Sequence, residues 1–255
     1  MNRILTPINI GAFELANRRV HSADEDDTAA ALPGSLHFAP LVVARDDRRS
    51  PESAAAPDAP PFGEMVGAIR ARKGIAVSRL AQSGRAADEP PIPPVGLDRL
   101  LAAFATAARR SIGAGFAGVE IDGTDLCTHV AGMEAGSQLL VEIVEAVAAE
   151  CPRERLGVRL APLACGANGA VDIVALHVAL LGALNDLEIA FVHLRLPPQA
   201  RTSTSFFPGD SDGRFRSAFR NSLILSGGLD ARSAEEALAR RFADAVGFAG
   251  EPVDT

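Results

Sequence analysis

The chain has 255 residues, of which 47% are hydrophobic and 22% charged, and its formal net charge is −7. The apolar fraction is too high for a disordered chain, and the length suffices for one large domain or two small ones. With 25 Lys and Arg residues against 32 Asp and Glu residues, the chain has no general cationic surface for nucleic acid or anionic lipid.

Short apolar or β-branched runs alternate with longer helical patterns along the chain. The predicted strands are 19–23, 41–44, 74–78, 118–122, 156–160, 189–196, 222–226 and 243–248. The predicted helices are 64–72, 98–112, 138–150, 171–184 and 233–242. Ser233 is expected to cap the last helix together with Glu236. The Pro-rich stretches 50–63 and 88–96 are predicted loops.

Strand–helix alternation of this kind predicts a parallel sheet. About eight βα units in about 250 residues is the size of a (β/α)8 TIM barrel. An open doubly wound sheet is the alternative, but the glycine-rich phosphate loops of that fold are absent. Because no linker divides two cores, we predict a single TIM-barrel domain over residues 1–255.

Several residue types are rare or missing. The chain has no Tyr to act as a proton donor and no Trp, and its single lysine, Lys73, is expected at the wrong end of the barrel for Schiff-base chemistry. Cys127, Cys151 and Cys165 are too irregularly spaced for a disulfide framework or structural zinc site and indicate reduced thiols. Without an export signal or a membrane-spanning stretch, we expect a soluble, cytoplasmic protein with no membrane or nucleic-acid partner.

The carboxyl ends of the strands are where a TIM barrel places its chemistry. They carry Asp24–Asp27, Asp46, Asp47, Arg79, Gln82, Asp122, Asp125, Arg159, His193, Arg195, Ser226, Gly227 and Gly228. This set predicts an acid-rich mouth with several arginines. The run Asp24–Asp27 and the segment Asp210–Gly213 lack a complete ligand pattern, so no metal is expected.

Asp122 and Asp125 form one candidate catalytic pair, because two close carboxylates can split their pKa values into an acid and a base. The alternative is a solvated or arginine-paired rim in which Asp125 caps a helix. Cys127 is a third candidate, and His129 is the only local group that could lower its pKa. Otherwise Cys127 is a small buried thiol.

Arg79, Gln82, His193 and Arg195 are the candidate substrate-binding residues. His193 and Arg195 alternate on one strand and therefore point to the same side of it. They either bind an anion in the mouth or serve as a packed histidine and a rim ion pair.

Five segments share their order with one family from end to end: LTPINIGAFELANR at 5–18, AGFAGVEI at 114–121, RLGVRLAP at 155–162, FRNSLILSGGLD at 219–230 and ADAVGFAG at 243–250. Together they resemble the old yellow enzyme family of flavin-dependent ene-reductases. The resemblance implies FMN across the mouth of the barrel and hydride transfer from NAD(P)H through the flavin to an activated alkene. A His/Asn or His/His pair would hold the carbonyl of that alkene, and a Tyr would protonate its α-carbon.

The resemblance also marks departures. It aligns the carbonyl clamp with Asp122 and Asp125, the catalytic Tyr with Cys127, and the flavin-amide Gln with Arg79. An ionised carboxylate only accepts hydrogen bonds and would repel an enolate. The phosphate-binding arginine of the family's closing segment aligns with Gly250. Compared with the family, this chain is shortened after strand four and at the C-terminus.

The remaining flavin-site features implied by the resemblance are Arg159 and the turn Gly227-Gly228, which can present backbone N–H groups to an anion. The alternative for Arg159 is an internal ion pair with Glu120 or Asp122.

Three functions follow as hypotheses. The first is a flavin-independent, redox-neutral isomerase, cyclase or lyase acting on a small apolar carbonyl or polyene, with no cofactor. The second is an FMN-dependent oxidoreductase using NADPH, and the third is a non-catalytic barrel that binds a partner or a second copy of itself.

Overall fold

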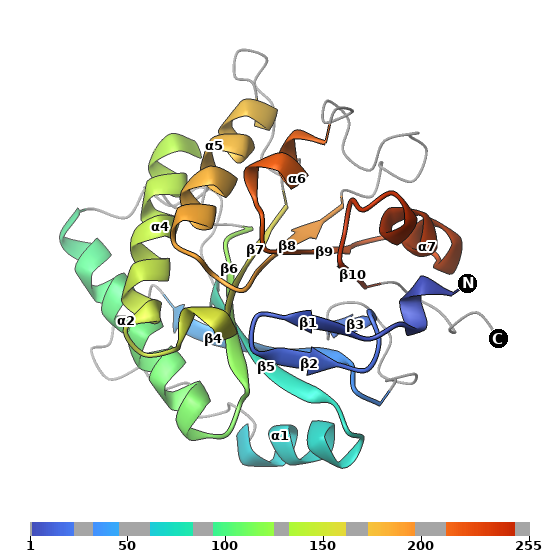
Figure 1. The fold of residues 1–255 in the computed structure, drawn as a ribbon. Coiled ribbons are helices and arrows are strands. Elements are labelled where there is room, and N and C mark those ends of the chain that lie inside the picture. The colour runs from blue at the N-terminus through green and yellow to red at the C-terminus, as the bar shows by residue number, and fades with distance from the viewer. Residues whose placement is uncertain are drawn as a thin grey trace.

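Eight parallel strands form the centre of the molecule. The computed structural model describes residues 2–22, 33–45, 62–83, 94–124, 133–161, 173–196 and 213–247. The strands follow one another in the order β10-β9-β8-β7-β6-β5-β4-β3, and a parallel bridge between Arg19 and Val246 joins the two ends of the sheet. Helices surround this sheet (Figure 1), so the prediction of a (β/α)8 barrel is confirmed.

The barrel strands are β3 (Val20–Ser22), β4 (Leu36–Arg45), β5 (Ile75–Ser83), β6 (Gly118–Asp122), β7 (Leu156–Leu160), β8 (Phe191–Arg195), β9 (Ser222–Ser226) and β10 (Ala245–Val246). The helices are α1 (Phe62–Ala71), α2 (Pro94–Gly113), α4 (Met133–Ala148), α5 (Ile173–Asp186), α6 (Arg214–Ala218) and α7 (Ala231–Ala239), with short 3-10 helices η1 (Arg3–Leu5) and η2 (Arg153–Arg155). Every predicted strand is present, although β4 and β5 are longer than predicted.

Each of the five predicted helices starts two to five residues away from its predicted first residue, and the starts of α2 and α7 have clear physical reasons. Helix α2 begins at Pro94, inside the stretch predicted to be a loop, because the first turn of a helix leaves its N–H groups without partners and so tolerates proline. Helix α7 is capped by Asp230 rather than by Ser233, so that prediction was wrong. The Asp230 carboxylate accepts the Ser233 N–H at 2.8 Å, and the Ser233 hydroxyl accepts the Asp230 N–H at 2.9 Å.

A hairpin that the sequence analysis did not predict covers the amino end of the barrel (Figure 1). It consists of β1 (Ile8–Ile10) and β2 (Phe13–Leu15), paired antiparallel. The Ala12 N–H in its turn donates to the Glu154 carbonyl at 2.8 Å, just before β7 begins. The Phe13 ring packs 6.5 Å from that of Phe191 at the start of β8. This cover leaves the carboxyl ends of the strands as the end available for chemistry.

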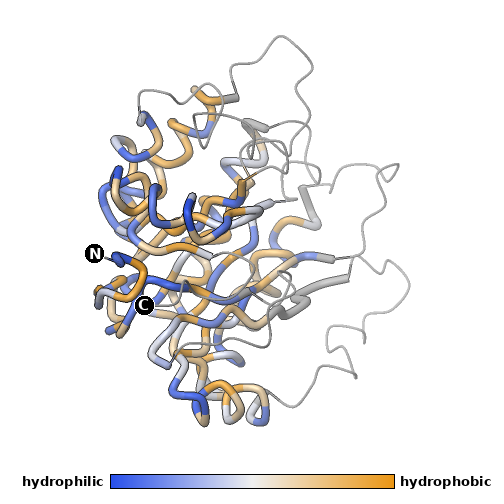
Figure 2. The backbone as a smooth tube through the Cα atoms, turned by 90° about the vertical axis from the view of Figure 1, so that its right-hand side faces the viewer, coloured by the Kyte–Doolittle hydropathy of each residue, from blue (hydrophilic) through white to orange (hydrophobic). Residues whose placement is uncertain are grey.

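Side chains alternate between the inside of the barrel and the helices. Val119, Val158 and Val192 point outward and join the large core that includes the helices, whereas Val77 and Phe191 point inward and pack with the hairpin. Hydrophobic residues accordingly follow the strands and the helix faces that lie against them (Figure 2). Among the helices of the described ranges, none combines the length and apolarity needed to cross a bilayer.

Candidate active site

A layer of ionic side chains lies inside the barrel above the apolar residues next to the hairpin. Glu120 is at its centre and is fully buried, on the inward face of β6. Its Oε2 accepts a hydrogen bond from Arg79 Nε at 2.5 Å, across the β5–β6 register that places these two residues opposite each other. Arg79 is 2% exposed, and its guanidinium carbon lies 5.2 Å from the centre of the Phe38 ring. Arg79 is therefore held by a carboxylate and an aromatic face.

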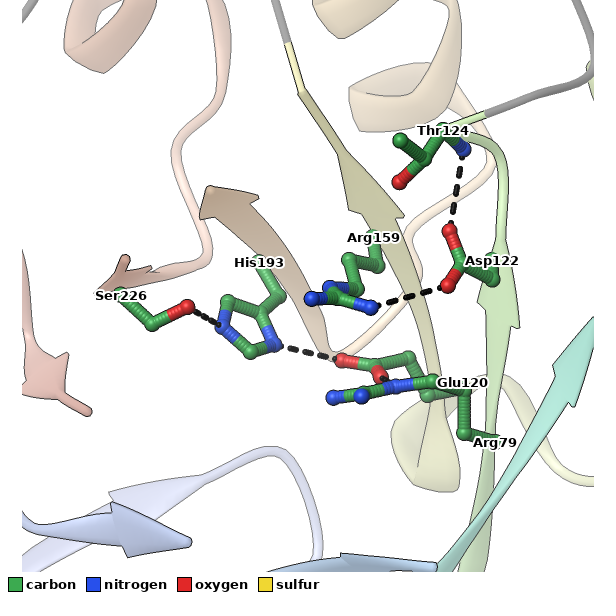
Figure 3. A network of polar contacts seen from close by, with 7 residues as sticks. All are labelled: Arg79, Glu120, Asp122, Thr124, Arg159, His193 and Ser226. Carbon is green, nitrogen blue, oxygen red and sulfur yellow. Dashed lines mark hydrogen bonds and ion pairs between the residues drawn. The ribbon is translucent and has the colours of Figure 1, made fainter. Parts of the chain in front are cut away.

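His193 continues this network on the other side of Glu120 (Figure 3). Its Nδ1 lies 2.8 Å from Glu120 Oε1, and its Nε2 lies 2.8 Å from the Ser226 hydroxyl. The imidazole is fully buried, and the Phe38 ring packs 5.2 Å from it. Each ring nitrogen thus has one polar partner, from β6 on one side and from β9 on the other.

A second ion pair lies nearer the mouth. Asp122 is the last residue of β6, and its Oδ2 accepts a hydrogen bond from Arg159 Nη1 at 3.0 Å. Its Oδ1 accepts the Thr124 N–H at 3.0 Å. The Asp122 side chain is 15% exposed, compared with 5% for Arg159. Asp122 is therefore the carboxylate of the described network that a bound molecule can reach. Figure 3 shows its contacts with Arg159 and Thr124.

Electrostatics keep Glu120 ionised. Burial acts to raise the pKa of its carboxyl, but the charge of Arg79, the contact and hydrogen bond with His193, and the charge of Arg159 together lower that pKa to about 2. A carboxylate in this state only accepts hydrogen bonds. The arrangement therefore consists of two arginines and two carboxylates, whose formal charges sum to zero, with an imidazole and a hydroxyl attached.

The structure locates most of the residues predicted for the site. Arg79 and His193 lie in the buried layer, and Arg159 forms the ion pair with Asp122 that was its alternative. Gln82 is half-buried near the end of β5, and Arg195 is exposed at the end of β8. Outside the described residues lie Asp24–Asp27, Asp46, Asp47, Asp125, Cys127, His129, Cys165, Asp210 and Gly250.

Two further predicted features are placed by backbone geometry. Gly227 and Gly228 directly follow β9, with φ of 89° and 70°, a conformation that L side chains rarely adopt. Lys73 lies in the turn before β5, at the amino end of that strand, as expected.

The central role of Glu120 was missed, because the sequence analysis named it only as an alternative partner of Arg159. The signal was its position on the same face as Asp122, two residues further along β6.

A separate pair of histidines lies on β3 and β4, close to the Arg19–Val246 bridge that joins the two ends of the sheet. His21 on β3 and His37 on β4 are direct neighbours in the register, and their rings stack with centroids 4.7 Å apart. Burial, together with His37 and Arg19, lowers the pKa of His21 to about 3. Burial and the charge of Arg72 lower the pKa of His37 to about 4. Both rings are therefore neutral in the folded protein at neutral pH.

This pair predicts acid sensitivity. Below pH 6.5, the ordinary histidine pKa, the unfolded chain takes up protons that the folded chain excludes until the pH reaches about 4. Stability is expected to fall over this interval and to be unaffected by these groups at higher pH. Urea unfolding followed by circular dichroism at about pH 7.5 and about pH 5 measures the effect. The double variant H21Q/H37Q should lose part of the difference; an unchanged difference would contradict the assignment.

Comparison with known proteins finds relatives whose sequences match part of this chain. A protein of Oryza sativa subsp. japonica whose name describes it as a 12-oxophytodienoate reductase is 31% identical over 169 residues, which covers 57% of this chain and 52% of that protein. 12-Oxophytodienoate reductase 2 of Arabidopsis thaliana is 29% identical over 168 residues, covering 57% and 43%. The chain thus spans about half the length of the curated relatives it matches. No protein-family model matches the chain.

Solved structures show the same fold over nearly the whole chain. A variant of NCR from Zymomonas mobilis superposes with a TM-score of 0.75 and 24% identity, covering 97% of this chain and 86% of that one. Morphinone reductase in complex with tetrahydroNAD gives a TM-score of 0.73 and 20% identity, covering 96% and 86%. At these identities the likeness shows the architecture.

Proposed function

The chain belongs to the old yellow enzyme family, and from this relationship we propose that it uses the family barrel for redox-neutral proton transfer on a small carbonyl compound. The observation that carries the proposal is Asp122, a carboxylate at the position that the resemblance aligns with the carbonyl clamp. It is the accessible carboxylate of the described network and is held by Arg159 and the Thr124 N–H. A carboxylate fixed by two donors can accept a proton in a defined direction.

The hydrogen bonds made by Arg79 and Arg159 support chemistry without flavin. The resemblance assigns the flavin ring to Arg159 and to the position of Arg79, and both guanidinium groups donate to carboxylates of the protein. A reduced flavin carries developing negative charge near N1, which a site of net positive charge stabilises. Here the negative charges of Glu120 and Asp122 cancel the positive charges of the two arginines. The charge of Asp122 also lies on the side where an enolate would form. These residues do not match the needs of a redox-active flavin.

The proposed reaction removes a proton next to a carbonyl group and returns it at the same or a conjugated carbon. Asp122 accepts the proton, while Arg159 holds the carboxylate in place. Gln82 and Arg195, near the carboxyl ends of β5 and β8, are the proposed donors to the carbonyl oxygen of the substrate. Phenylalanines are the only aromatic residues in the chain, which agrees with an apolar substrate.

Exchange of substrate protons with solvent deuterium tests the proposal. Cyclohexanone and cyclohex-2-enone would be incubated with the protein in deuterated buffer and followed by NMR. The variant D122N, which keeps the shape of the side chain, is expected to slow enzymatic exchange by at least about 100-fold. The matched control is D98N, which changes an exposed aspartate on α2 and should leave exchange unchanged. Equal exchange in D122N and D98N would exclude Asp122 as the base.

An FMN-dependent reductase is the second candidate function. It is favoured by the consecutive left-handed glycines Gly227 and Gly228, a geometry suited to an anion such as a phosphate, and by the names of the relatives. Visible absorbance of the purified protein and titration with FMN decide between the two. Tight FMN binding would replace the proposed function with the reductase. A colourless protein that neither binds FMN nor catalyses exchange would favour a non-catalytic, partner-binding barrel.

A further inference from the structure

Three residues of the buried layer stand in the order hydroxyl, imidazole, carboxylate. Ser226 ends β9, His193 lies on β8, and Glu120 lies on β6. The Ser226 hydroxyl is 2.8 Å from His193 Nε2, and His193 Nδ1 is 2.8 Å from Glu120 Oε1 (Figure 3). Two consecutive hydrogen bonds of this length, one on each nitrogen of the ring, form a relay from the hydroxyl to the carboxylate.

The direction of each hydrogen bond follows from the charge on Glu120. Because this carboxylate is ionised, it can only accept, so His193 Nδ1 must carry a proton and donate it. In the neutral ring, Nε2 then has no proton and accepts the hydrogen bond from the Ser226 hydroxyl. This tautomer is the one that a histidine needs to act as a general base toward a serine.

Arg79 and Phe38 fix the geometry of the relay. Arg79 Nε donates a hydrogen bond to Glu120 Oε2, and the other carboxylate oxygen, Oε1, pairs with His193. The Phe38 ring lies 5.2 Å from the imidazole and 5.2 Å from the Arg79 guanidinium, so it limits the motion of both. Arg79 is therefore a positioning residue that acts on the serine through Glu120 and His193.

Ser226 adjoins the mouth of the barrel. Its own side chain is buried, but Gly227 is half-buried and Gly228 is exposed. Both glycines have positive φ, and the N–H of the exposed Gly228 is the proposed donor to an oxyanion. Because Ser226 itself is fully buried, the proposed substrate is limited to one with a small acyl group.

From this arrangement we propose that Ser226, His193 and Glu120 form a Ser–His–Glu acyl-transfer triad that hydrolyses a small carboxylic ester. Ser226 Oγ forms a bond to the acyl carbon while His193 Nε2 takes the hydroxyl proton. The bond from that carbon to the leaving alcohol oxygen then breaks, and His193 returns the proton to the alcohol. Water attacks the acyl-serine with the same assistance, releasing the acid and restoring the Ser226 hydroxyl. The reaction needs no cofactor and goes beyond the proton transfer assigned to Asp122.

A sulfonylating reagent tests the nucleophile directly. The folded wild-type protein would be treated with methanesulfonyl fluoride, and the modified residue located by mass spectrometry of peptides. The expected label is on Ser226, with a labelling rate at least about 100-fold lower in H193Q, which keeps a polar side chain but has no basic nitrogen. Hydrolysis of p-nitrophenyl acetate should fall in parallel in S226A and H193Q. The matched control is S78A, because Ser78 is also buried but contacts the Ser111 hydroxyl at 2.9 Å.

The wild-type labelling result does not depend on whether the variants fold. Absence of the label from Ser226 in folded wild-type protein would overturn the proposal and leave the three residues a structural role. Equal ester hydrolysis in folded S226A and S78A would also overturn it. Deuterium exchange of ketones involves Asp122 and not Ser226, so the failure of one function is distinguishable from the failure of the other.

Discussion

Replacing Glu120 with glutamine is expected to lower the free energy of unfolding by about 3–5 kcal/mol. The substitution keeps the size and shape of the side chain but removes the negative charge between Arg79 and Arg159. These residues are 2% and 4% exposed, so neither guanidinium can recover its hydration. One carboxylate, that of Asp122, would then have to compensate two buried cations, and breaking a buried pair in this way leaves an uncompensated charge.

Urea unfolding followed by far-ultraviolet circular dichroism measures this loss, because a chain without Trp has no tryptophan fluorescence to follow. The control is E150Q, which breaks the ion pair of Glu150 with Arg109 on the protein surface. That pair is exposed to water, so its loss should leave the unfolding midpoint where it is. If E120Q and E150Q unfolded at the same urea concentration, the buried charges would not be coupled as the structure indicates.

Replacing Gly157 with alanine is expected to destabilise the barrel by about 1–3 kcal/mol or more. Gly157 lies on β7 with its α-carbon facing the interior, next to Phe191 on β8. A Cβ at this position would meet two ring atoms of Phe191 at 2.2 Å, which is far inside van der Waals contact. The Phe191 ring is also in contact with Phe13 and Phe38, so it cannot move aside without disturbing the packing against the hairpin.

A double-mutant cycle identifies the ring as the cause. F191L removes part of the ring volume and should destabilise the protein by itself through a cavity. In the double variant G157A/F191L the new methyl group occupies part of that space, so the loss should be smaller than the sum of the two single losses. Strict additivity in thermal or urea unfolding would show that the alanine acts elsewhere on β7.

The architecture was predictable because it depends on repetition. Apolar runs such as 118–122 and 156–160 recur between helical patterns, and each forms a strand at the predicted place. The hairpin of β1 and β2 was not predictable in this way, because each of its strands has three residues and so shows too little alternation. Its position depends on long-range packing of Phe13 against Phe191, which no local pattern contains.

The site was predictable as a set of residues but not as a set of pairs. Alternation places Glu120 and Asp122 on one face of β6, and this can be inferred from the spacing alone. The partner of each carboxylate depends on the register between neighbouring strands, which sets Arg79 opposite Glu120 and Arg159 opposite Asp122. Register is a property of two strands and of the core that aligns them. For the same reason the contact between His193 and Ser226 could not be inferred from either segment.

Closure of the barrel at Arg19 and Val246 has a consequence for self-association. The last strand, β10, has two residues. The polar contacts across the seam include the Val246 N–H donating to the Arg18 carbonyl at 2.8 Å and the Arg18 side chain donating to the Asp244 carbonyl at 3.0 Å. A closed sheet has no free edge, but separation at this seam would expose the unpaired backbone of β3 and β10 together. Such edges are templates for pairing with the corresponding strands of another molecule. The seam is therefore the place where partial opening would turn a barrel that is complete within one chain into one that exchanges strands between chains.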